Sequence, residues 1–175
     1  MATLMNERLV FASGEDGPTD AKALIEDALE VWRERGLRDQ ARRDRLMRAW
    51  VATQVVGFLV ARAAQRRTTD TPGHEGSLVK VAMTELNRTV SELTVDLLGP
   101  AGTILAEPYA DGRYQERGEG PSSDPRMRFL RARANTIEGG TSEAQRNNIG
   151  EHVLGLPGEP RTDKTLPWSQ VPRSL

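Results

Sequence analysis

The segment from residue 79 to residue 97 constrains the fold of this chain more than any other part of the sequence. Its apolar side chains recur at steps of four and three, namely Val79, Met83, Leu86, Val90, Leu93 and Leu97. That spacing places them on one side of an α-helix, in the pattern of a seam between packed helices. The segment therefore predicts a long helix that is buried along one side against other helices.

Further helices are expected on both sides of this segment, separated by clusters of glycine and proline. Their expected ranges are residues 2–13, about 21–35, about 39–67, about 126–135, and 141 or 142 to about 154. Residues 104–125 are expected to form a surface excursion. The predicted fold class is all-α: an antiparallel four-helix bundle plus a terminal helix. Residues 1–157 would form this bundle, and residues 158–175 an extended, proline-rich tail.

The helix expected over residues 39–67 has a broad apolar face, which predicts that it lies inside the bundle. The residues of this face are Leu46, Met47, Trp50, Val51, Val55, Phe58, Leu59 and Ala63.

Composition excludes several classes of function. The chain has no cysteine, which removes disulfides, thiolate catalysis and cysteine-based metal sites. Its formal net charge of −1 provides no overall field for nucleic acid or an anionic membrane. No uninterrupted apolar run approaches the roughly 20 residues that cross a bilayer, and His74 and His152 are too isolated in the sequence to indicate a metal site. We therefore expect a cytoplasmic protein without metal, nucleic-acid or membrane partners.

Two adjacent glycines, Gly139 and Gly140, lead into the last predicted helix. Glycine allows backbone angles and close approaches that a side chain would block, and Thr141 or Ser142 can cap the helix that follows. Ser142 and Gln145 have the spacing of a capping box. The free N–H groups and positive dipole end of such a helix suit a phosphate or pyrophosphate, although most turns of this kind are simply helix starts.

A longer string around this turn closely resembles the C-terminal signature of the acyl-CoA dehydrogenase family. The string covers residues 136–147, Thr-Ile-Glu-Gly-Gly-Thr-Ser-Glu-Ala-Gln-Arg-Asn, with Val-Leu-Gly-Leu-Pro at residues 153–157. The resemblance extends to residues 4–10, 96–102 and 129–135, in the family's order. It implies the family's C-terminal four-helix bundle, without the N-terminal helical and middle β domains. We therefore expect a truncated enzyme or a naturally split subunit.

The resemblance also implies a catalytic carboxylate, which removes the α-proton of an acyl-CoA while a hydride passes to FAD. The family carries this base either two residues before the threonine of the glycine turn or immediately before an arginine of the first bundle helix. Here the first position is Gly139, with Glu138 displaced by one residue, whereas Glu7 precedes Arg8. Glu7 is therefore the favoured base, and Glu138, or no working base, stays open. Substrate contacts are expected from Asn6, Arg8 and Gly140.

Two segments are expected, by the same resemblance, to bind FAD. The start of the last helix would contact it through Thr141, Ser142 and Glu143. The turn after the helix predicted over residues 79–97 would approach the FAD of a neighbouring subunit through Leu98, Gly99 and Pro100. Many family members also bind the flavin phosphate through an arginine after the second bundle helix, where either Arg33, Arg35 or neither substitutes here.

The implied function is an FAD-dependent acyl-CoA dehydrogenase with an acyl-CoA substrate and an electron-transfer flavoprotein as partner. It would assemble as a homo- or hetero-oligomer, a dimer or a tetramer. One alternative is a non-catalytic bundle that completes the FAD site and the interface of a heteromeric dehydrogenase. Another is a free-standing helical interaction protein without flavin.

Overall fold

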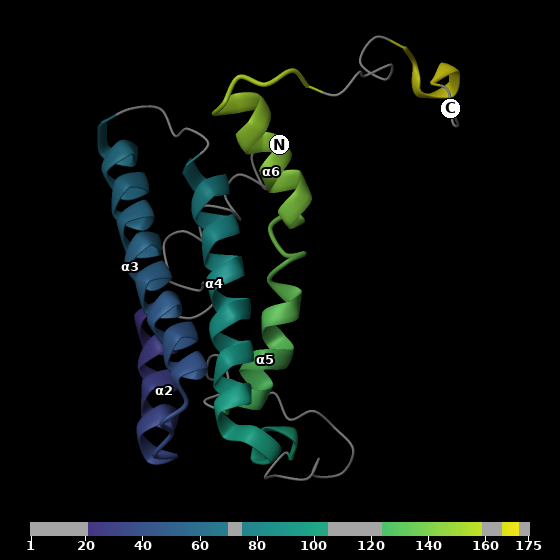
Figure 1. Cartoon of the computed structure of the whole chain (residues 1–175). Helices are drawn as coiled ribbons and strands as arrows, with labels where there is room; N and C mark the ends of the chain where they lie inside the picture. The colour runs from purple at the N-terminus through teal and green to yellow at the C-terminus, as the bar shows by residue number, and fades with distance from the viewer. Residues whose placement is uncertain (1–20, 70–74, 105–123, 159–165, 172–175) are drawn as a thin grey trace.

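The computed structural model of the chain describes residues 21–69, 75–104, 124–158 and 166–171, and this part contains helices and no strand. The helices are α2 (Ala21–Glu34), α3 (Gln40–Thr69), α4 (Glu75–Leu98), η1 (Gly99–Thr103), α5 (Pro125–Ala134), α6 (Ser142–His152) and η3 (Trp168–Gln170). In Figure 1, α2, α3 and α4 alternate in direction, and α5 and α6 follow one another along α4. The all-α antiparallel bundle with a terminal helix is thus confirmed. The helix expected over residues 2–13, the excursion over 105–123 and much of the tail lie outside the described residues.

Helix α4 is the centre of the bundle, because α2, α3, α5 and α6 all contact it. The predicted seam is correct: five of its six residues are buried, and Met83 is half-buried. Leu86, Val90, Leu93 and Leu97 pack against the inner faces of α2 and α3 in one apolar core, and Val79 packs with Ala63 of α3 in a second, smaller cluster. The core residues of the three helices are Leu24, Ile25, Ala28, Val31, Leu46, Ala49, Val56, Leu86, Val90, Leu93 and Leu97.

Helix α3 differs from the prediction for its apolar face. Only Leu46 and Ala63 of that face are buried, and Leu59 is half-buried. Five large apolar side chains are instead exposed, namely Met47, Trp50, Val51, Val55 and Phe58. The reason is that apolar residues cover more of the circumference of α3 than α2 and α4 can contact. The expectation that all of them lie inside the bundle is wrong.

One stretch of α3, Gln40–Arg66, is long and apolar enough to cross a membrane by length and composition alone. A single helix of this kind is weak evidence for a membrane span, because core helices of other proteins also meet these criteria. Here one side of α3 packs on α2 and α4 in the core. The expectation of no membrane partner stays a prediction.

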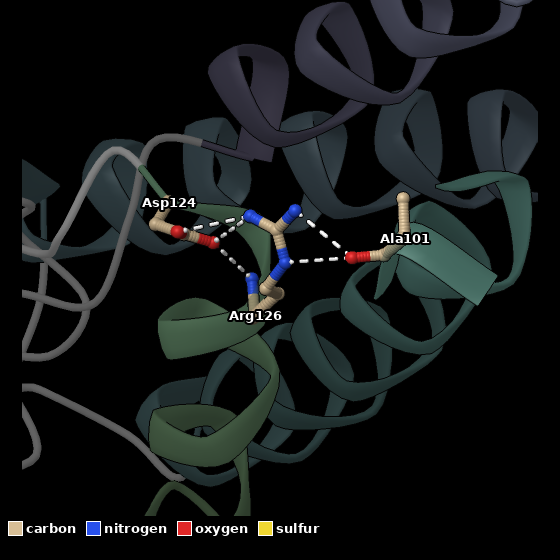
Figure 2. A network of polar contacts seen from close by, with 3 residues as sticks. All are labelled: Ala101, Asp124 and Arg126. Carbon is tan, nitrogen blue, oxygen red and sulfur yellow. Dashed lines mark hydrogen bonds and ion pairs between the residues drawn. The ribbon is translucent and has the colours of Figure 1, made fainter. Parts of the chain in front are cut away.

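The two ends of the segment between α4 and α5 are held together by Arg126 (Figure 2). The Nε and Nη2 atoms of Arg126 donate to the Ala101 carbonyl at 3.1 and 3.0 Å, and its Nη1 pairs with Asp124. Asp124 also caps α5, because its carboxylate accepts the backbone N–H of Arg126 at 2.8 Å. The start of α5 is therefore fixed against η1 at the end of α4.

We expect Leu93→Ala to lower the free energy of unfolding by about 2–5 kcal/mol, because Leu93 is 1% exposed at the centre of the core. Leu130→Ala, on the 53%-exposed side chain of Leu130 in α5, is the matched control and should change it by less than about 1 kcal/mol. Urea unfolding followed by circular dichroism measures both. Equal losses in the two variants would contradict the assignment of the core.

Candidate functional site

A stripe of buried polar side chains runs along α4, on the side that faces α5 and α6. Its members, Lys80, Thr84, Asn87 and Ser91, recur at helical spacing and are all buried. Asn135, just after α5, receives two of their hydrogen bonds: the Thr84 hydroxyl donates to its carbonyl at 3.2 Å, and Asn87 Nδ2 donates to its Oδ1 at 2.7 Å. The stripe thus fixes the end of α5 on α4, because buried polar groups stabilise only when they are paired.

The Gly139–Gly140 turn is held by two buried side chains, one from α4 and one from α6. Lys80, which is 2% exposed, donates from Nζ to the Gly140 carbonyl at 2.8 Å. Gln145, which is 0% exposed, donates from Nε2 to the Gly139 carbonyl at 2.7 Å. Both glycines have positive φ, 63° and 96°, a conformation that residues with a side chain rarely adopt. The turn is therefore a specified structure rather than a loose connection.

The predicted helix start is correct, but the predicted capping box does not form. Thr141 is the N-cap, and its hydroxyl accepts the backbone N–H of Ala144 at 3.2 Å. The Gln145 side chain does not reach back to cap the helix, because it donates to the Gly139 carbonyl instead. Gln145 is thus used to shape the turn, and the capping role of Ser142 with Gln145 is wrong.

The carboxylate of Glu143 lies at the positive end of α6. Its pKa is held below the usual value, first by a backbone hydrogen bond at Glu143 itself and then by the Thr141 hydroxyl, with smaller contributions from Arg146 and Lys80. This carboxylate already supplies the negative charge that a helix start attracts. The start of α6 therefore has one carboxylate beside its free N–H groups.

A pocket of about 300 Å³ opens between α4, residues 136–137 before the glycine turn, and the start of α6. Two arginines, Arg88 and Arg146, and two glutamates, Glu85 and Glu143, balance its charge, and Arg146 pairs with Glu85. The other lining residues are Thr84, Thr136, Ile137, Thr141 and Ser142. The structure thus brings the predicted cofactor residues Thr141, Ser142 and Glu143 together in one concave site.

The alternative base Glu138 does not line this pocket. Its carboxylate accepts a hydrogen bond from Arg131 of α5 in an ion pair. Glu7, Asn6 and Arg8 lie outside the described residues, so their roles stay predictions.

The predicted contact to the cofactor of a neighbouring subunit lies at the C-terminal end of α4, whereas the pocket contacts the middle of this helix. Leu98 and Gly99 are 14 and 15 residues from Thr84, which corresponds to roughly 20 Å along a helix. Arg35, at the end of α2, lies beside this turn: a Cβ atom built on Gly99 would lie 3.4 Å from Arg35 Nη2. The chain therefore presents two separate candidate regions, and Arg35 is the arginine that adjoins the second one.

Sequence reasoning missed Lys80, Asn87 and Asn135 as determinants of the site. The sequence did contain a signal, since four polar residues of α4 recur at the spacing of one helical face, beside the apolar seam. A polar stripe of this kind normally indicates a solvent-exposed face. Only the contact of α4 with α5 and α6 shows that it is buried.

We expect Lys80→Met to speed hydrogen exchange of the Ala144 and Gln145 amides by about tenfold, because the turn before α6 loses its donor from α4. Hydrogen exchange measured by NMR or mass spectrometry reports this local change. Lys22→Met is the matched control, since the Lys22 side chain is 76% exposed. Unchanged protection in Lys80→Met would show that Lys80 does not hold the turn.

The lowered pKa of Glu143 predicts a pH dependence at the start of α6. A carboxylate whose pKa is lowered by folding stabilises the folded state above its unfolded pKa, near 4.5, and this contribution is lost as the pH falls through the lowered value. Removing the hydroxyl in Thr141→Val should raise the pKa of Glu143 in a carboxyl NMR titration. If the pKa of Glu143 is the same in both proteins, the hydroxyl has no part in the shift.

The comparisons with known proteins agree with one another. A family profile described as "Acyl-CoA dehydrogenase, C-terminal domain" matches residues 1–154. The acyl-CoA dehydrogenase IpdE1 of Mycobacterium tuberculosis (strain ATCC 25618 / H37Rv) is 31% identical over 161 residues, which are 91% of this chain and 38% of that protein. IpdE1 of Mycolicibacterium smegmatis (strain ATCC 700084 / mc(2)155) is 32% identical over 117 residues, 67% of this chain and 26% of that protein.

Two solved structures share the fold. The "Tcur3481-Tcur3483 steroid ACAD G363A variant" matches with a TM-score of 0.61 and 22% identity, over 78% of this chain and 34% of that chain. The ChsE4–ChsE5 complex from Mycobacterium tuberculosis matches with a TM-score of 0.60 and 23% identity, over 81% of this chain and 37% of that chain. The chain thus spans less than two-fifths of the length of each of these relatives. It belongs to the acyl-CoA dehydrogenase family, of which it represents the C-terminal domain.

Proposed function

We propose that this chain is the cofactor-facing C-terminal bundle of an FAD-dependent acyl-CoA dehydrogenase, which introduces an α,β double bond into an acyl-CoA thioester. The observation that carries this proposal is the turn at Gly139 and Gly140, held by Lys80 and Gln145 beside a polar pocket. Family membership supplies the reaction class.

The residues at the start of α6 suit part of a flavin. The pocket offers hydroxyl, backbone and guanidinium groups, and its charges balance, which fits a neutral polar ring or ribityl chain. Two buried polar atoms, Asn135 Nδ2 and Gln145 Oε1, have no hydrogen-bond partner within the described structure. Thr141, Ser142 and Glu143 would therefore hold FAD, which supplies the hydride acceptor when bound.

A second contact to FAD is proposed at Gly99, with Leu98, Pro100 and Arg35 around it. From Arg88, which lines the first pocket, to this turn, α4 rises by roughly 15 Å. As the family resemblance implies, the turn would serve the cofactor of a neighbouring subunit. The Arg35 guanidinium beside Gly99 provides a fixed positive charge for a phosphate. In this arrangement the start of α6 binds a neutral part of one cofactor. The turn at Gly99, with Arg35 beside it, binds an anionic part of another.

Glu7 is the proposed base. The absence of a side chain at Gly139 leaves the other family position empty, and Glu138 is engaged by Arg131 away from the pocket. Glu7 would take the α-proton of the thioester, and Asn6, Arg8 and Gly140 would contact the substrate. The electrons would then pass to an electron-transfer flavoprotein.

Because one solved relative is described as a steroid enzyme, polycyclic acyl-CoA thioesters are the substrate class we propose to test first.

The test uses the chain together with the family's N-terminal and middle domains, in one polypeptide or as an assembled complex. We expect Glu7→Gln to retain FAD and to lose at least about a hundredfold in kcat, because the proton acceptor is removed. The matched variant Glu138→Gln should keep near-normal kcat. Stopped-flow bleaching of the flavin by linear and steroid-derived acyl-CoA thioesters measures both.

Each outcome of this experiment discriminates between the hypotheses. Full activity in Glu7→Gln would remove Glu7 from the mechanism, and loss in Glu138→Gln alone would assign the base there. Flavin that stays bound but is never reduced by any thioester would favour a bundle that only completes the site of a different catalytic subunit. Absence of flavin from the assembled protein would overturn the proposal.

A further inference from the structure

The Gly99 turn, defined as residues 98–100, leads from α4 into the short helix η1. Gly99 has a φ of 60°, in the left-handed region that favours glycine. A Cβ atom built on Gly102 would lie 2.7 Å from a backbone carbonyl oxygen of α4, so η1 folds back closely on α4. Helices of the 3₁₀ type have poorer hydrogen-bond geometry than α-helices, and the bond from the Ile104 N–H to the Ala101 carbonyl is 3.3 Å long. Local hydrogen bonds alone thus hold η1 weakly, and contacts from other elements matter for the shape of the turn.

Arg126 of α5 supplies such a contact (Figure 2). Its Nε and Nη2 atoms both donate to the Ala101 carbonyl, at 3.1 and 3.0 Å, and its Nη1 contacts both carboxylate oxygens of Asp124, at 3.1 and 3.0 Å. The guanidinium is a rigid, planar fork, so one group holds both partners in a fixed geometry. Both side chains are half-buried, and hydrogen bonds from a charged donor are stronger than those between neutral groups. Arg126 therefore fixes η1 to the start of α5.

The carbonyl that Arg126 holds lies directly after the Gly99 turn. Ala101 follows Pro100 in the chain and is two residues from Gly99. Because η1 is a single helix of five residues, a shift of this carbonyl would carry the backbone of the turn with it. Arg35, the proposed phosphate contact, lies beside Gly99 and belongs to the end of α2. The position of the turn relative to that charge thus depends on where η1 is held.

We propose that Arg126 is a positioning residue for the cofactor contact at the Gly99 turn. By holding the Ala101 carbonyl it keeps residues 98–100 in the conformation that meets the FAD of a neighbouring subunit. Arg126 does not bind the cofactor itself, since its guanidinium is occupied by Ala101 and Asp124. This inference rests on the function proposed above for the turn.

Another arginine of α5 provides a matched control. Arg133 forms an ion pair with Glu92 of α4 and lies over the Phe129 ring. It therefore helps to attach α5 to the bundle, as Arg126 does, but neither of these contacts includes an atom of η1. Replacing Arg133 loosens α5 without removing a hydrogen bond to the Ala101 carbonyl.

The test compares the affinity for FAD and the KM for an acyl-CoA in the chain assembled with the family's N-terminal and middle domains. In Arg126→Met we expect the dissociation constant of FAD to rise by about five- to tenfold, because the turn loses a charged double donor. The KM should stay unchanged, since the proposed substrate contacts lie elsewhere. Arg126→Lys keeps the charge but not the fork, and should recover part of the loss, to a rise of about two- to threefold. Arg133→Met should leave the affinity for FAD within about twofold of the parent.

Hydrogen exchange on the same proteins locates the change. The amides of Gly102 and Ile104 should exchange faster in Arg126→Met and remain at the parent rate in Arg133→Met. The Ala144 amide, at the start of α6, should be unaffected in both variants. Circular dichroism verifies that each variant keeps its helices.

The outcomes separate this inference from the proposed function. If the parent assembly binds FAD and an acyl-CoA reduces it, but Arg126→Met binds FAD as tightly as the parent, the proposed function stands and the role of Arg126 is overturned. Equal losses in Arg126→Met and Arg133→Met would also overturn it, because they would reflect a general loosening of α5. A parent assembly without flavin would overturn both. If Arg126→Met does not fold, parent-like FAD affinity in Arg126→Lys contradicts the need for the guanidinium fork.

Discussion

The hydrogen bond from Lys80 to the Gly140 carbonyl links the centre of the bundle to the part of the chain that carries the family signature. A lysine that is 2% exposed is costly to bury unless its ammonium group is paired. The Gly139–Gly140 turn supplies a partner, and Gln145 of α6 donates to the neighbouring carbonyl, that of Gly139. The position of α6, and with it the pocket at its start, depends on this arrangement.

Helix α4 therefore has two roles at once. Its apolar seam forms the core with α2 and α3, and its polar stripe fixes the corner between α5 and α6. It also connects the pocket at α6 with the Arg35–Gly99 cluster, since α4 rises by roughly 15 Å from Arg88 to Leu98.

Much of the fold could be predicted from the sequence, because the seam of α4 and the glycine and proline breaks are local patterns. The exposed side of α3 could not, since periodicity shows which residues share a face and not which face meets a neighbour. Lys80 was missed because lysine is almost always exposed. The predicted capping box does not form, because the Gln145 side chain donates to the Gly139 carbonyl. The grouping of Thr141, Ser142 and Glu143 in one pocket followed from their place at a helix start, which the glycine pair and the threonine indicated.

The most direct test of this account is the affinity of the assembled dehydrogenase for FAD in Lys80→Met, compared with Lys22→Met. If the buried lysine holds the turn that shapes the cofactor pocket, the dissociation constant of FAD should rise by about tenfold in Lys80→Met, the effect of losing about one hydrogen bond. It should stay unchanged in Lys22→Met. Equal FAD affinity in the two variants, with the fold intact, would contradict the claim that the link between α4 and the glycine turn shapes this site.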